Sequence, residues 1–252
     1  MSKAGYLAEV FSSIQGEGLL VGVRQVFVRL AGCNLSCRYC DTPESRVAPF
    51  FCRVERSPGR VDFHELSNPV ELDDLLKFIR QLNRVKHHSV SLTGGEPLCQ
   101  PEFVSQLIQG VHQVGLPAYL ETNGSLAEPL ASLEVAPDYV AMDIKLPSAT
   151  SQPACWDQHE NFLTALGRMV PLNSGRCFAK AVVVRGTTDE EIAQAAQLLA
   201  KHCRALPIII QPVSPIGQSP PADRLLELVQ VASHYLDEVR LIPQVHKLLR
   251  LP

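Results

Sequence analysis

Three cysteines that lie close together constrain this chain more than any other feature of its sequence. Cys33, Cys37 and Cys40 follow a C-x3-C-x2-C spacing, directly after the apolar run at residues 26–30. Iron-sulfur clusters are held by cysteine thiolates, normally four for a cube of four irons. A cube held by only three cysteines has one iron that can bind another ligand. The spacing therefore predicts a 4Fe-4S cluster with an open coordination site.

A structural zinc site is the alternative interpretation of these cysteines. A closed zinc site needs four ligands, and the nearest further candidates, Cys52 and His64, lie in a segment without a second C-x2-C pair. Because the other cysteines are scattered singly, we expect buried or incidental thiols and no disulfide framework. These single cysteines are Cys52, Cys99, Cys155, Cys177 and Cys203.

Length and composition bound the kind of protein. The 252 residues, 46% of them hydrophobic, can bury one substantial core, so we expect a single domain over residues 1–252. A net charge of -3 and the lack of a basic run argue against a nucleic-acid surface. The sequence has no apolar run near 18 residues and no apolar signal-peptide core at its start, so we expect no membrane segment and a cytoplasmic protein.

Short apolar runs alternate with helical patterns along the chain. Strands are expected at residues 6–11, 26–30, 88–92, 118–122, 139–144, 178–184, 208–211 and 238–242. Helices are expected at residues 69–85, 102–114, 156–169, 189–202 and 222–236. This alternation predicts an α/β fold with about seven parallel core strands and helices outside, too few strands for a closed eight-stranded barrel. The proline-containing segment 43–68 is expected to be a loop insert.

Polar side chains gather near the ends of the expected strands. Active sites in parallel sheets lie beyond the carboxyl ends of the strands. The residues expected there are Thr93, Glu121, Thr122, Asn123, Asp143, Lys145, Gln211 and Gln244. Arg29 places a charge within an apolar strand, which indicates either an anion-binding side chain or a solvent-facing one.

The cysteine spacing resembles the signature of the radical S-adenosylmethionine (SAM) superfamily, in which the amine and carboxylate of SAM chelate the open iron. The resemblance implies a radical SAM core, a partial, open TIM-like barrel of parallel strands with outer helices. Tyr39 corresponds to an aromatic residue beside the adenine, although it could also be a loop aromatic that only packs. Gly94, Gly95 and Glu96 match a second motif, in which backbone groups at the glycines bind the SAM amino group and the glutamate either fixes the turn or pairs with that amine. An ordinary strand-to-helix turn has a similar pattern.

Several longer strings resemble the 7-carboxy-7-deazaguanine synthase family. They are FSSIQGEG at 11–18, CDT at 40–42, ETNG at 121–124, DIK at 143–145 and IPQVHK at 242–247. The resemblance implies a carbon-nitrogen lyase of queuosine and related 7-deazapurine biosynthesis, a tRNA modification pathway. Such an enzyme converts 6-carboxy-5,6,7,8-tetrahydropterin to 7-carboxy-7-deazaguanine with loss of ammonia, using SAM, a 4Fe-4S cluster and Mg2+.

The resemblance also implies roles for individual residues, with the radical generated on the cofactor and no catalytic side chain. Cys33, Cys37 and Cys40 would hold the cluster, and Thr42 would bind Mg2+. The cofactor would contact Tyr39, Cys40, Asp41, Gly94, Gly95, Glu96, Asp143, Lys145 and Gln211. The substrate would contact Ile14, Gln15, Gly16, Glu17, Thr93, Pro252 and Arg29, the last of which would pair with its carboxylate.

The expected partners are the pterin substrate, an electron donor such as flavodoxin or ferredoxin, and a second copy of the chain in a homodimer. Many relatives have Ser-Pro-Lys where this chain has residues 143–145, and segment 43–68 has no counterpart that aligns. A radical SAM enzyme acting on a different small substrate is therefore an alternative. Two others are an activase for a glycyl radical enzyme and a non-catalytic cluster-binding or zinc-binding protein.

Overall fold

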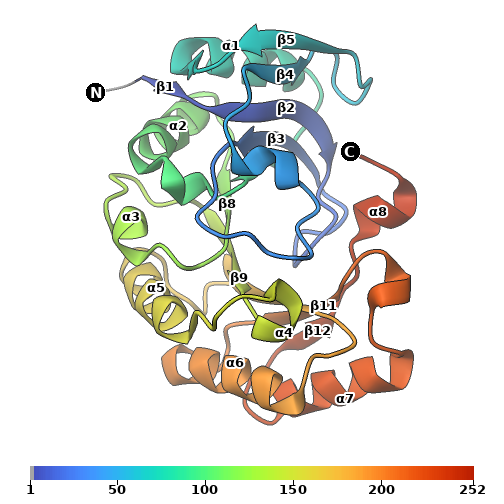
Figure 1. Cartoon of the computed structure of the whole chain (residues 1–252). Helices are drawn as coiled ribbons and strands as arrows, with labels where there is room; N and C mark the ends of the chain where they lie inside the picture. The colour runs from blue at the N-terminus through green and yellow to red at the C-terminus, as the bar shows by residue number, and fades with distance from the viewer. Residues whose placement is uncertain (1–2) are drawn as a thin grey trace.

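The computed structural model describes residues 3–252, and its centre is a ten-stranded sheet (Figure 1). Its strands are β2 (Leu7–Ile14), β3 (Arg24–Leu30), β4 (Phe51–Glu55), β5 (Phe63–Ser67), β7 (Ser89–Gly94), β8 (Ala118–Thr122), β9 (Tyr139–Ile144), β10 (Cys177–Val183), β11 (Ile208–Pro212) and β12 (Val239–Leu241). They lie in the order β12-β11-β10-β9-β8-β7-β3-β2-β4-β5. The strands from β12 to β3 in this order are mutually parallel, whereas β2 is antiparallel to β3. Among the described residues no pairing joins β12 to β5, so the sheet is an open partial barrel, as predicted.

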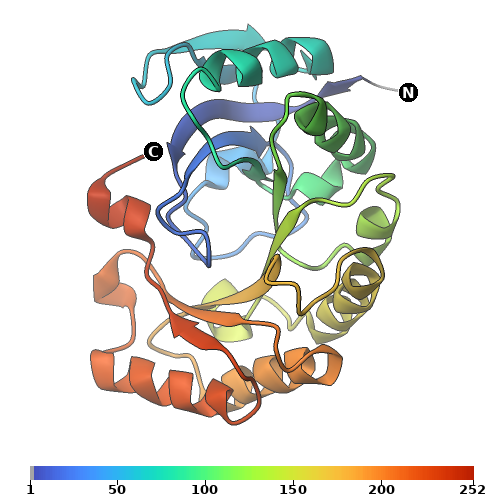
Figure 2. The ribbon, with the colours of Figure 1, turned by 180° about the vertical axis from the view of Figure 1, so that it is seen from behind.

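The longer helices lie on the outside of the curved sheet, as Figures 1 and 2 show from opposite sides. They are α1 (Leu72–Leu82), α2 (Pro101–Gln113), α5 (Trp156–Met169), α6 (Asp189–His202) and α7 (Ala222–Ser233). Each buries an apolar stripe; in α1 this is Leu75, Leu76 and Ile79. The start of α6 is fixed by a capping box between Thr188 and Glu191.

Several shorter elements complete the fold. They are the helices α3 (Ala127–Ala131), α4 (Pro147–Thr150) and α8 (Val245–Leu249), the 3-10 helices η1 (Pro43–Arg46), η2 (Pro97–Cys99) and η3 (Ile216–Gln218), and a small sheet of β1 (Ala4–Gly5) with β6 (Val70–Glu71). The expected helix at 69–85 begins only at Leu72, because Val70 and Glu71 pair with β1. Helix α8 was not predicted.

The prediction of a loop insert at 43–68 is wrong. Strands β4 and β5 form an antiparallel pair that extends the sheet beyond β2. Side chains in β4 alternate between the two faces of the sheet, as in a half-buried strand. Cys52 and Val54 are buried, whereas Phe51 and Arg53 are exposed. Buried Glu55 accepts a hydrogen bond from the backbone nitrogen of Ser12, 2.8 Å away, which ties β4 to β2.

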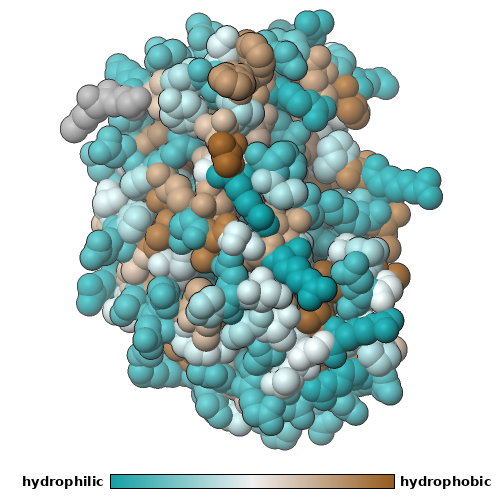
Figure 3. All heavy atoms as spheres, viewed as in Figure 1, coloured by the Kyte–Doolittle hydropathy of each residue, from teal (hydrophilic) through white to brown (hydrophobic). Residues whose placement is uncertain are grey.

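The surface of the front face is mostly hydrophilic, with hydrophobic side chains in scattered groups (Figure 3). None of the helices within residues 3–252 is long and apolar enough to cross a membrane.

Candidate active site

One cavity inside the partial barrel brings together most of the predicted site residues. The predicted residues that line it are Gln15, Gly16, Glu17, Arg29, Cys33, Cys37, Tyr39, Cys40, Asp41, Thr42, Thr93, Gly94, Gly95, Asp143, Lys145, Gln211 and Pro252. The polar residues expected at the carboxyl ends of the strands, including Glu121 and Gln244, line it as well. Ile14 and Glu96 do not.

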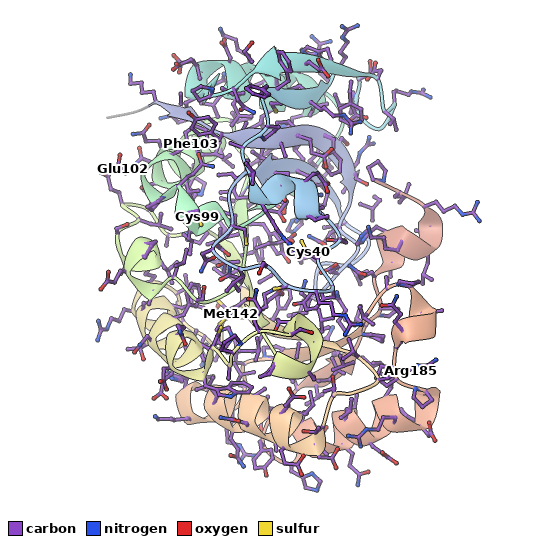
Figure 4. All side chains as sticks on the ribbon, in the orientation of Figure 1. Cys40, Cys99, Glu102, Phe103, Met142 and Arg185 are labelled. Carbon is purple, nitrogen blue, oxygen red and sulfur yellow. The ribbon has the colours of Figure 1, made fainter. Side chains whose placement is uncertain are left out.

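The cavity lies between two connections at opposite ends of β3. The hairpin that follows β2 is at the amino end of β3, because Ile14 pairs with Arg24. The loop with the three cysteines begins just after the carboxyl end of β3 and crosses in front of the sheet, where Figure 4 labels Cys40. The cavity is therefore bounded at one end by the hairpin and at the other by the cysteine loop.

All three cysteines of the motif are free thiols that face the same cavity. As they stand, no three His, Cys, Asp or Glu side chains within residues 3–252 gather closely enough to hold a single metal ion. A four-iron cluster is larger than an ion, so its thiolate ligands stand farther apart. Burial raises the pKa of the Cys33 and Cys37 thiols, so in the cofactor-free chain they are protonated near neutral pH, and binding iron would displace these protons.

The Gly-Gly-Glu-Pro turn after β7 packs directly on the cysteine loop. A Cβ on Gly95 would lie 2.1 Å from the carbonyl oxygen of Gly32, so only glycine fits. The Gly95 and Glu96 backbone nitrogens donate to Leu30 and Gly32 oxygens at 3.0 and 2.7 Å. The carboxylate of Glu96 is fully buried and accepts from the Asn123 nitrogen and the Thr122 hydroxyl, at 2.7 and 2.9 Å. Glu96 therefore fixes this turn, one of its two predicted roles, and its side chain does not line the cavity.

A network of charges crosses the cavity floor. The Nζ of Lys145 lies 2.6 Å from Asp143 and 3.0 Å from the Tyr39 hydroxyl. Lys180 contacts the other oxygen of Asp143 at 3.2 Å and also pairs with Glu17. Burial alone would lower the pKa of Lys145, but the adjacent Asp143 carboxylate outweighs it and raises that pKa well above its usual range. Lys145, Lys180 and Asp143 therefore remain ionised near neutral pH, and Lys180 connects them to Glu17.

Glu121 is the centre of a second polar group. Its carboxylate accepts hydrogen bonds from Gln15, Ser91 and Thr93 at 2.8, 3.0 and 3.1 Å. Burial raises its pKa above the usual value. The side chain of Gln15 also donates to Gln25 at 2.9 Å. The side chains of Gln15 and Glu121 are therefore held in place by hydrogen bonds within the protein.

Gln211, at the end of β11, has an unused acceptor. Its side chain is 2% exposed and lines the cavity, and its Oε1 has no hydrogen-bond partner among the described residues. A buried polar atom without a partner is costly unless a ligand or water satisfies it. The oxygen is therefore suited to accept a hydrogen bond from a bound molecule.

Helix α8 covers one side of the cavity. The Val245 nitrogen donates to the Gly16 oxygen at 2.9 Å, and Gln244 donates to Glu17 at 2.6 Å. Lys247 lies 3.2 Å from Asp41, which follows Cys40 on the cluster loop. The Ser13 hydroxyl donates to the Pro252 oxygen at 3.1 Å. The end of the chain thus joins the hairpin to the cysteine loop.

Sequence reasoning missed several residues of the cavity. Lys180 is a charge in the middle of the otherwise apolar strand β10, a signal like that of Arg29 that could have found it. Arg46, whose Nη2 donates to the Cys37 oxygen at 2.6 Å, lies outside the predicted strands and gave no local signal. Lys247 belongs to the IPQVHK string at 242–247, but no role was predicted for it.

Comparisons with known proteins agree with this architecture. The family model of the radical SAM superfamily matches residues 28–199. A 7-carboxy-7-deazaguanine synthase of Geobacter sulfurreducens is 43% identical over 99% of this chain and 99% of its own length. One of Methanothermobacter thermautotrophicus is 38% identical over 97% of both. The crystal structure of QueE from Escherichia coli has the same fold, with a TM-score of 0.63 at 24% identity over 96% of this chain and 95% of its own. The chain belongs to the 7-carboxy-7-deazaguanine synthase family of radical SAM enzymes.

Proposed function

We propose that the cavity converts 6-carboxy-5,6,7,8-tetrahydropterin to 7-carboxy-7-deazaguanine with loss of ammonia. One observation carries this proposal: the same cavity is lined by the three cysteines, by Arg29 near the carboxyl end of β3, and by Gln15 and the hairpin at the amino end of β3. A cofactor at the cysteines and a small carboxylated substrate beside Arg29 would then share one enclosed space. Full-length relatives that carry the name of this activity favour it over a glycyl radical activase or a zinc protein.

Cys33, Cys37 and Cys40 would hold the 4Fe-4S cluster through their thiolates. When bound together, the cluster and SAM supply the radical chemistry. Asp143, Lys145 and Tyr39 would hold SAM. Asp143 and Lys145 form an ion pair, and their opposite charges would complement the amine and the carboxylate of SAM. Gln211 would accept a hydrogen bond from SAM through its unused oxygen.

The substrate would lie between the hairpin and the cysteine loop. Arg29 offers a planar fork suited to a carboxylate, and Glu121, Gln15 and Thr93 form a fixed polar surface for the pterin ring. Thr42 would give a hydroxyl ligand to Mg2+, which prefers oxygen ligands and completes its shell with water and substrate oxygens. A homodimer and a flavodoxin or ferredoxin as electron donor complete the proposal.

Anaerobic turnover tests this function. The reconstituted protein would be supplied with SAM, dithionite, Mg2+ and 6-carboxytetrahydropterin, and the deazaguanine product followed by mass spectrometry. We expect product from the parent protein and none from Cys37→Ala. Formation of 5'-deoxyadenosine without the deazaguanine would contradict the proposed substrate while leaving the radical SAM family unaffected.

A further inference from the structure

Two fully buried side chains tie together the turns at the carboxyl ends of three adjacent strands. Glu96, after β7, accepts hydrogen bonds from Thr122 and Asn123, which lie at the end of β8. His159, on helix α5, lies between the next two turns and contacts Gly124 after β8 and Lys145 after β9. His159 is 0% exposed and does not line the cavity. It therefore acts on the cavity only through the backbone that it holds.

The chemistry of the two contacts fixes the state of the imidazole. Nδ1 of His159 lies 2.9 Å from the carbonyl oxygen of Gly124, and Nε2 lies 2.9 Å from the backbone nitrogen of Lys145. A carbonyl can only accept and an amide N–H can only donate, so a neutral ring with its proton on Nδ1 satisfies both. Burial lowers the pKa of His159 to about 4, which keeps the ring neutral near pH 7.

The backbone of Lys145 is the point where this contact reaches the cavity. The Lys145 side chain crosses from this turn to Asp143, 2.6 Å away, and to the hydroxyl of Tyr39 on the cysteine loop, 3.0 Å away. A displacement of the Lys145 backbone would separate Nζ from both groups. The position of the Lys145–Asp143 ion pair therefore depends on Nε2 of His159, which accepts the hydrogen bond from the Lys145 backbone.

We propose that His159 is a positioning residue for SAM, because its Nε2 fixes the Lys145 backbone and thereby the contacts of Lys145 with Asp143 and Tyr39. The inference rests on the proposed function, which takes Asp143 and Lys145 as SAM-binding residues. It assigns a role to a residue of an outer helix that touches neither cofactor nor substrate.

Two substitutions separate the two contacts of His159. A glutamine amide reaches about as far as Nε2 and can still accept from Lys145, whereas an asparagine amide reaches about as far as Nδ1 and can only serve Gly124. Loss of a buried hydrogen-bond acceptor should weaken SAM binding about tenfold in His159→Asn. We expect His159→Gln to bind SAM within about threefold of the parent, since the acceptor is kept. Equilibrium binding of SAM to the reconstituted proteins measures this.

Hydrogen exchange of the Lys145 amide in the cofactor-free protein gives a second readout that needs no activity. We expect fast exchange in His159→Asn and protection in His159→Gln. The matched control is Leu163→Ala, one turn further along α5 and also 0% exposed. It should lower the stability of the same helix while the Lys145 amide and SAM affinity stay as in the parent.

Three results would overturn the proposal. They are parent-like SAM binding in His159→Asn, equally weak binding in His159→Gln, and equally weak binding in Leu163→Ala. If His159→Asn does not fold, His159→Gln carries the test, because a protected Lys145 amide with lost SAM affinity contradicts the inference. These measurements use SAM alone, so a failure of the proposed pterin substrate would be seen separately, in the turnover assay.

Discussion

Glu9 and Arg29 are register partners on β2 and β3, and the Nε of Arg29 lies 2.9 Å from Oε1 of Glu9. Within residues 3–252 this is the only hydrogen bond of the Arg29 side chain, so both Nη nitrogens can bind a ligand in the cavity. The cation is oriented by β2 before substrate enters. The sequence string alone did not show that Arg29 has an acidic partner.

Replacement of Arg29 by lysine should therefore impair substrate binding. Lysine cannot form a two-pronged contact with a carboxylate, so we expect the KM for the pterin to rise about 10- to 100-fold with little change in the KM for SAM. Steady-state kinetics with each substrate varied measure this. Arg53→Lys is the control, because Arg53 also approaches Glu9, at 3.9 Å, but its side chain is 56% exposed. An unchanged KM in Arg29→Lys would contradict the assignment.

Only the three cysteines of the motif should be needed for the cluster. We expect Cys33→Ser, Cys37→Ser and Cys40→Ser to lose most of the iron bound after anaerobic reconstitution, because each removes one thiolate ligand. Cys52→Ala should keep the iron of the parent, since Cys52 is buried in the core beside β5. Iron content and the visible absorbance measure both. Loss of iron in Cys52→Ala would show that a fourth cysteine takes part.

The hydroxyl of Thr42 should set the requirement for Mg2+. Thr42→Val keeps the shape of the side chain and leaves the backbone bonds to Ser45 intact. We expect the Mg2+ concentration for half-maximal rate to rise about tenfold, because one oxygen ligand is lost. Thr42→Ser is the control, since it keeps the hydroxyl that would bind Mg2+. Full activity after chelation of Mg2+ would refute the metal site.

The neutral state of His159 makes stability depend on pH. The pKa of His159 falls from 6.5 to about 4 on folding, so the unfolded chain binds more protons between these values. The free energy of unfolding should therefore decrease as pH falls from about 6.5 to about 4, and His159 should account for up to about 3 kcal/mol of that decrease. His159→Gln cannot titrate there, so its difference from the parent should shrink as pH falls. Urea unfolding of the cofactor-free proteins measures this, and parallel pH profiles would disprove it.

The pair of Lys247 and Asp41 should link α8 to the cysteine loop through charge. Both side chains are partly exposed, at 43% and 44%, so the effect is expected to be modest and sensitive to salt. Asp41→Lys should raise the KM for the pterin several-fold at low ionic strength, and the double exchange with Lys247→Asp should recover part of it. No recovery in the double variant would mean that the charge pair does not hold the helix.

Local sequence signals predicted much of the fold. The strands at 118–122 and 139–144 and the helices at 156–169 and 189–202 have the predicted bounds. The two strands are short, mostly buried apolar runs, and both helices bury residues at helical spacing; the helix at 189–202 also begins with a capping box. The prediction for segment 43–68 was wrong because its prolines suggested a loop. In the structure β4 and β5 pair with each other, and β4 also pairs with β2, a contact distant in sequence.

In the candidate site, too, some features could be predicted from local sequence and others depend on contacts between distant residues. The sequence by itself determined the cluster motif, the glycine turn and the polar residues at strand ends, because short-range spacing and residue chemistry suffice for them. Only the tertiary structure decided that Glu96 faces inward, that Lys180 pairs with Glu17 across the cavity, and that His159 holds the Lys145 backbone. Such contacts join residues far apart in the chain, and their geometry exists only once the sheet has curved and the helices have packed on it.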